Sequence, residues 1–219
     1  MYDAHLERLA SWATGPRFEA EIAAAREAFF RATGPVHEDD RSFETRMSAL
    51  SEYYLLDRPL DGDEVGRTPA RLFLDEMGAD LSDADRAVHD GLARSRPGLY
   101  QIRRLKDGEV VVRDTFERSD ATVHERRRLA GLEKGDLVLA RLVPFDEQLL
   151  FGRAFVFQPR EARRLILKAV KRKLKAGEIE TAESREALLF QLAHLALTCE
   201  RQQANNRTPP PVDRIYAAL

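Results

Sequence analysis

Five short segments between residues 97 and 159 constrain the fold of this chain more than any other feature. They read GLYQIRR, EVVVRDTF, ATVHE, GDLVLARLVPF and QLLFGRAFVFQP, and turn sequences such as KDG and EKGD separate them. Short runs of β-branched and aromatic residues between turns are typical of strands. Because a closed sheet leaves no unpaired edge, five such strands predict a small barrel-like domain or a rolled sheet.

Helical patterns flank the strands on both sides. In two N-terminal segments, apolar residues recur at the three- and four-residue spacing of a helix face. They are Phe18, Ile22, Ala25 and Phe29 in the first, and Phe43, Met47, Leu50 and Tyr54 in the second. We therefore expect an α+β fold with a helical N-terminal region, a central small five-stranded β-barrel-like domain and a helical C-terminal region. The expected bounds are 1–96 for the helical region, 97–159 for the β-domain, 160–204 for a C-terminal helical pair and 205–219 for a Pro-rich tail.

Composition bounds the classes of protein that this chain can belong to. Hydrophobic residues make up 43% of it, which is typical of a globular protein. The single cysteine, Cys199, excludes an internal disulfide and a cysteine-cluster zinc site. The N-terminus lacks the pattern of a secretory signal, and no apolar run approaches the roughly 20 residues of a membrane span. We expect a cytoplasmic protein without a membrane segment.

Charge is distributed unevenly along the chain. Residues 1–97 hold 12 basic and 20 acidic side chains, a net charge of −8, whereas residues 98–219 hold 23 and 17, a net charge of +6. Within 126–175 the balance is 14 to 5. Such asymmetry favours a side of the molecule that faces a polyanion. Pairing of the basic half with the acidic half, or with a partner protein, would explain the asymmetry equally well.

The segment RRLILKAVKRKLK at 163–175 is the strongest basic feature. On a helical wheel its apolar residues occupy one arc and five cations another. The cations are Arg164, Lys168, Lys171, Arg172 and Lys175. Such a stripe suits a phosphate backbone. A solvated amphipathic helix is the simpler interpretation, and a membrane-surface helix is a third.

Arginines in the predicted strands extend the basic set. Alternation along the last hairpin, with a turn near Asp146 and Glu147, places Arg141 and Arg153 roughly opposite each other, among aromatic residues. Proteins that bind nucleic acids use arginine beside aromatic side chains on a small sheet for phosphate contacts and base stacking. A phenylalanine core with arginines at its rim is the alternative. Arg126, Arg127 and Arg128 would enlarge the same surface if it exists.

No sequence pattern indicates a catalytic, metal or nucleotide site, so we predict no catalytic residues, metal ligands or cofactors and favour a protein that is not an enzyme. Our leading hypothesis is a non-catalytic binding protein that engages nucleic acid through residues 126–175. The alternative is a protein–protein adaptor that uses the acidic N-terminal half and the apolar helix at 183–203. That helix is apolar around most of its circumference, which predicts either a central position or self-association.

Several stretches resemble a loose group of uncharacterised bacterial proteins. They include SALSEYYLLDRPLDGDEVGRTPARLFLDE, SRPGLYQI, VVVRDTF and GDLVLARLVPF, within residues 43–159. The resemblance implies an N-terminal helical region followed by a small β-domain. Some members carry a C-terminal SEC-C type zinc motif, which this chain lacks because it has one cysteine. The resemblance implies an architecture and no activity.

Overall fold

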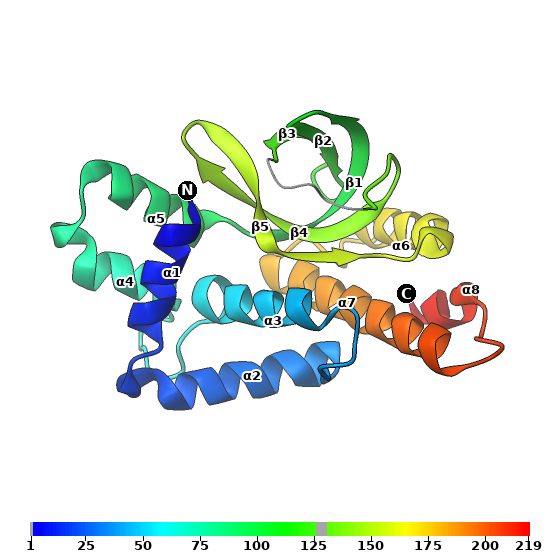
Figure 1. Cartoon of the computed structure of the whole chain (residues 1–219), viewed down its shortest axis with the longest axis horizontal. Helices are drawn as coiled ribbons and strands as arrows, with labels where there is room; N and C mark the ends of the chain where they lie inside the picture. Colours follow the sequence, from blue (N-terminus) through cyan, green and yellow to red (C-terminus); the bar gives the residue numbers. More distant parts are fainter. Residues whose placement is uncertain (1, 126–130) are drawn as a thin grey trace.

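The structure is a computed structural model and describes residues 2–125 and 131–219. It has an α+β fold in which helices from both ends of the chain pack on one antiparallel sheet (Figure 1). The helices are α1 (Tyr2–Ala13), α2 (Glu19–Thr33), α3 (Phe43–Glu52), α4 (Pro69–Met77), α5 (Asp83–Arg94), α6 (Arg163–Lys175), α7 (Ala182–Asn205) and α8 (Val212–Ile215). The strands are β1 (Pro97–Lys106), β2 (Glu109–Asp114), β3 (Asp120–His124), β4 (Leu137–Phe145) and β5 (Gln148–Phe157).

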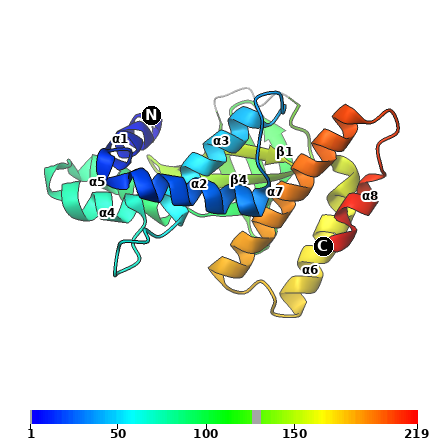
Figure 2. The same ribbon diagram turned by 90° about the horizontal axis from the view of Figure 1, so that it is seen from below.

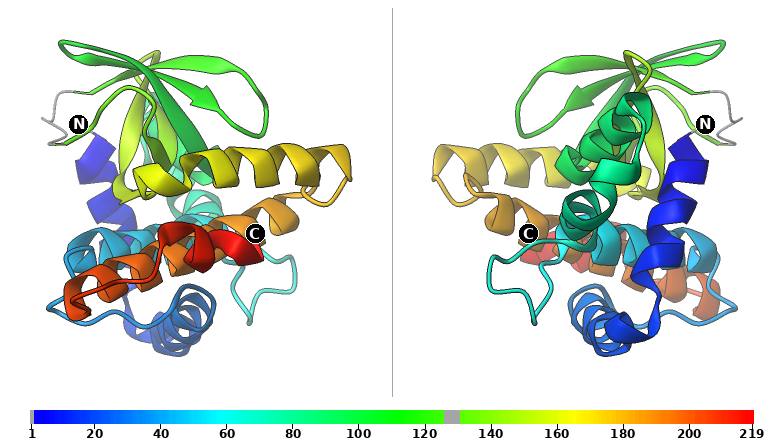
Figure 3. Two further views of the ribbon diagram at one scale, coloured as in Figure 1. Left: turned by 90° about the vertical axis from the view of Figure 1, so that its right-hand side faces the viewer. Right: turned by 90° about the vertical axis from the view of Figure 1, so that its left-hand side faces the viewer.

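The sheet has the strand order β3-β2-β1-β4-β5, and its neighbouring strands are antiparallel. The five strands are those predicted, but the prediction of a barrel is wrong because the sheet is open at β3 and β5. It curls around a core of its own, which includes Ile102, Val112 and Phe151 (Figure 3). The turn predicted between β4 and β5 is confirmed, with Asp146 and Glu147 both at positive φ.

The opposite face of the sheet is covered by helices. α3 packs against β5, α7 contacts β1 and β5, and α2 lies beneath α3 and α7 as the outermost layer (Figure 1). α1, α4 and α5 form a second group, whose core reaches the tip of the β4–β5 hairpin at Val143. Within the described part of the chain, no helix is long and apolar enough to cross a bilayer.

α7 occupies a central position, which settles the choice left open by its apolar circumference. Its leucines and Cys199 are buried between the sheet, α2, α6 and the C-terminal segment. They are therefore not an exposed surface for a partner or a second copy. The tail after 205 docks as well, because Tyr216 and Leu219 are buried beside α6 and α7 (Figure 2).

We expect Leu192→Ala to destabilise the protein by about 2–5 kcal/mol, because it leaves a cavity in the central core. Leu192 has no exposed surface, whereas Leu105 is 40% exposed on β1. Leu105→Ala is the control, and we expect it to change stability by less than about 0.5 kcal/mol. Urea denaturation measures both variants. Equal losses would contradict the central position of α7.

Candidate functional site

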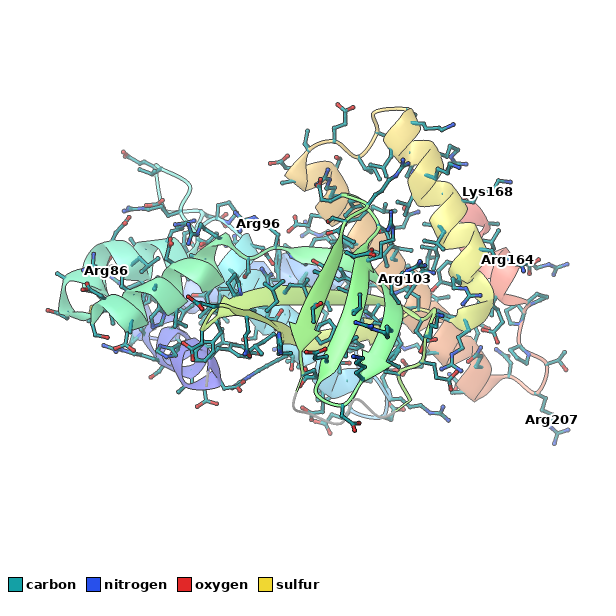
Figure 4. The ribbon with its side chains drawn as sticks, turned by 90° about the horizontal axis from the view of Figure 1, so that it is seen from above. Arg86, Arg96, Arg103, Arg164, Lys168 and Arg207 are labelled. Atoms are coloured by element: carbon teal, nitrogen blue, oxygen red, sulfur yellow. The ribbon has the colours of Figure 1, made fainter. Side chains whose placement is uncertain are left out.

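The five cations of the predicted stripe are all exposed on α6. The helix packs through Ile166, Ala169 and Val170, so the basic face points away from the core. Arg172 donates to the backbone carbonyl of Leu219. In the described structure, Arg164, Lys168, Lys171 and Lys175 form no ion pair. Figure 4 shows Arg164 and Lys168 along α6, with Arg103 of β1 toward the same side of the molecule.

Arg153, by contrast, is neutralised by the N-terminal helix. Its Nε lies 2.9 Å from Asp3 Oδ1, and its Nη2 lies 2.7 Å from Glu7 Oε1. The pKa of Arg153 is raised, chiefly by the hydrogen bond to Glu7. The acidic N-terminal half therefore pairs with this arginine of the basic half, which is the pairing named above as an alternative explanation of the charge asymmetry. Arg126, Arg127 and Arg128 lie outside the described residues.

Arg141 does not lie on a basic surface. Its side chain is 2% exposed, and all three of its guanidinium nitrogens are engaged. Nε donates to Glu52 Oε2 at 3.2 Å, Nη1 to the Ser95 carbonyl at 2.8 Å, and Nη2 to Asp57 Oδ2. The prediction that Arg141 contributes to a nucleic-acid surface is therefore wrong: a buried guanidinium is stable only when paired, and its partners enclose it.

The β4–β5 pairing is broken opposite Arg141, whose side chain faces the helices together with Leu139 and Val143. The register runs regularly to Ala140 opposite Phe155 and resumes at Leu142 opposite Phe151. In a regular strand, consecutive N–H groups point to opposite edges. Here the N–H groups of Arg153 and Ala154 both donate to Glu52 Oε1, at 2.7 and 3.0 Å. The Glu52 carboxylate thus occupies the gap in the ladder. Bulges of this kind interrupt strand pairing and are frequent next to functional sites.

Asp57 reaches the same place through a π-helical turn. α3 continues into Tyr53–Asp57, where the N–H of Arg58 donates to the Tyr53 carbonyl five residues earlier at 2.9 Å. This wider turn places residues five apart near each other, so Glu52 and Asp57 both face Arg141. Burial raises the pKa of Asp57 although the Arg141 guanidinium opposes this shift. Asp57 Oδ1 is buried and has no hydrogen-bond partner within the described chain.

Glu186 of α7 completes this group of charged residues, which we call the carboxylate cluster: Glu52, Asp57, Arg141 and Glu186. All four line one cavity of about 80 Å³ between the sheet and the helices. Glu186 is half-buried, and within the described residues it has neither a hydrogen bond nor an ion pair. Burial, followed by the neighbouring carboxylates of Asp57 and Glu183, raises the pKa of Glu186 to about 7.

Reasoning from sequence missed the three carboxylates of this cluster. The signal was the arginine within LVLARLVPF, because an arginine inside an apolar strand requires a buried partner. The spacing of Glu52 and Asp57 did not reveal them, since residues five apart face different sides of an α-helix.

Residues 25–194 match a family of unknown function, DUF7986. The chain belongs to this family. The DUF7986 region contains the whole carboxylate cluster and α6, whereas α1 precedes it. The match agrees with the resemblance to a group of uncharacterised proteins. No curated protein and no solved structure matches the chain.

We expect Arg141→Ala to destabilise the protein by about 3–5 kcal/mol, because Glu52 and Asp57 lose their buried partner. Arg153→Ala removes an arginine with a 37% exposed side chain from the neighbouring strand and should cost about 1 kcal/mol or less. Chemical denaturation of the two variants gives the comparison. A loss for Arg141→Ala as small as that for Arg153→Ala would refute the buried pairing.

The raised pKa of the Glu186 carboxyl predicts that the stability of the protein depends on pH. Its pKa is about 7 in the folded protein against an ordinary value of 4.5. Between these pH values the folded state binds more protons than the unfolded chain, so this group makes stability fall as pH rises, and the penalty is complete above pH 7.

Glu186→Gln removes the penalty, so its stability relative to the native protein should increase between pH 4.5 and 7. Urea denaturation across this range measures the difference, with the exposed Glu180→Gln as control. A constant difference between Glu186→Gln and the native protein would argue against a perturbed Glu186.

Proposed function

We propose that this chain is a non-catalytic nucleic-acid-binding protein that holds the phosphate backbone through the exposed face of α6. The observation that carries the proposal is the contrast between cations that are paired with carboxylates and cations that are not. Arg141 and Arg153 are paired with carboxylates of the N-terminal half. Among the residues with described positions, Arg164, Lys168, Lys171 and Lys175 have no such partner and face solvent.

The dimensions of the stripe suit a phosphate backbone. From Arg164 to Lys175 the helix advances about 16 Å at 1.5 Å per residue. Over that length, duplex DNA presents on the order of ten phosphate charges. Arg118, which is exposed in the turn after β2, lies with Lys171 on the lining of a groove of about 310 Å³ between α6 and the sheet. A phosphate backbone that extends beyond α6 at Lys171 would therefore contact Arg118 as well.

The expected mode of binding is independent of base sequence. Aromatic side chains for base stacking do not accompany the stripe: the residues that α6 buries are aliphatic, and the exposed Phe157 lies on β5. Contacts of this kind orient a nucleic acid without reading its sequence. As parts of the same proposal, the protein works in a bacterial cytoplasm and is related to the group of which some members carry a zinc motif.

The proposal predicts binding that depends steeply on salt. Phosphate contacts by Arg118, Arg164, Lys168, Lys171 and Lys175 give a slope of about −4.5 for log K against log [salt] on duplex DNA. Lys168→Glu, Lys171→Glu and Lys175→Glu together should reduce the slope to about −1.8 and weaken binding at least a hundredfold at low salt. Fluorescence polarisation with labelled duplex DNA and labelled duplex RNA over a salt series measures both quantities.

A matched control separates the stripe from overall charge. Arg8→Glu, Arg26→Glu and Arg41→Glu change the net charge equally on exposed positions of the N-terminal region. This variant should bind nearly as tightly as the native protein, with an unchanged slope. Equal weakening by the two triple variants, or unchanged binding in the lysine variant, would refute a role for α6.

A further inference from the structure

The carboxylate cluster lies at the inner end of a larger opening. A cleft of about 450 Å³ shares four lining residues with the cavity of about 80 Å³. These are Asp57, Pro97, Glu186 and Leu189. Asp57 and Glu186 therefore line both spaces, so a molecule that enters the cleft lies beside both residues.

The cluster is short of positive charge. It holds three carboxylates, and Arg141 pairs with two of them, Glu52 and Asp57. In the part of the chain that is described, Glu186 has no partner, and Asp57 keeps one oxygen unpaired although its side chain is only 8% exposed. A buried carboxylate oxygen without a donor is costly. The site is thus built to accept a donor that carries positive charge.

The lining indicates which kind of cation fits. The described residues contain no group of three or more His, Cys, Asp or Glu side chains arranged for a metal ion. Calcium and magnesium ions need six or more oxygen or water ligands, and the small cavity is lined mostly by apolar side chains such as Phe29, Leu139 and Phe190. An ammonium group needs only a few acceptors and tolerates apolar surroundings on its carbon side.

The cleft adds further acidic and aromatic surface. Asp114, Glu117 and Glu183 line it together with the rings of Tyr100 and Phe116. Its two arginines are already engaged. Arg96 (Figure 4) donates to the carbonyls of Ala93 and Ser95, and Arg185 pairs with Glu117. Carboxylates beside aromatic rings are the surroundings that organic cations prefer.

We propose that the cleft and the cavity bind a small primary amine, whose ammonium group donates to Asp57 and Glu186 while its apolar body lies against Tyr100 and Leu189. The site is separate from the basic face of α6 and does not depend on nucleic-acid binding. It joins α7 to the π-helical turn, so an occupied site would also tie the central helix to the sheet through Arg141.

Protonation of Glu186 would also reduce the negative charge of the carboxylate cluster. Probes matched in shape but not in charge distinguish protonation from amine binding. The full-length protein is titrated at pH 8 with n-butylamine and benzylamine, and with n-butanol and benzyl alcohol as uncharged counterparts. Calorimetry and thermal unfolding follow the binding. We expect saturable binding and a rise in Tm with the amines only, with benzylamine the tighter because of its ring.

Two variants locate the binding. Glu186→Gln removes a charge that has no partner in the described structure, so it should fold normally and bind benzylamine at least tenfold more weakly. Glu180→Gln, which alters an exposed glutamate shortly before α7, should bind as the native protein does. Equal responses to benzylamine and benzyl alcohol, absence of saturable amine binding, or undiminished binding by Glu186→Gln would each overturn the proposal.

Discussion

The guanidinium of Arg141 is held by groups from three elements, and the packing of the helices on the sheet depends on this arrangement. Glu52 ends α3, Asp57 ends the π-helical turn, and Ser95 follows α5. Separating α3 or the π-helical turn from the sheet would take a charged partner from Arg141, which costs far more than the loss of an exposed pair. The interaction fixes the relative positions of the parts more than it adds to stability.

Pairing of this sort divides basic residues of the C-terminal half into those that contact carboxylates of the N-terminal half and those that face solvent. Arg141 and Arg153 satisfy carboxylates of the first 57 residues, and this accounts for part of the charge asymmetry of the sequence. In the described part of the chain, Arg164, Lys168, Lys171 and Lys175 remain unpaired, because α6 packs beside α8 and the sheet, at a distance from the acidic helices (Figure 2). Net charge alone does not make this distinction, since pairing depends on tertiary position.

Local patterns determined much of what the sequence could predict. The five strands, the turn at Asp146 and the exposed stripe of α6 each follow from a short period or a turn signal. Closure of the sheet was predicted wrongly, because it depends on strand tilt and stagger, which no local pattern encodes. The carboxylates that surround Arg141 were missed for a related reason: the broken β5 ladder that receives Glu52 and the π-helical turn that ends at Asp57 each replace the regular period on which the reasoning relied.

The gap in the ladder at Arg153 and Ala154 has a consequence for the order of folding. These N–H groups find their acceptor in Glu52, which lies about a hundred residues earlier in the chain. Tyr2 likewise donates to the carbonyl of Phe151 across 149 residues. Contacts of such separation form late, because the loop-closure entropy must be overcome first. The last hairpin therefore gains its full set of backbone hydrogen-bond partners only when the N-terminal helices are docked on it.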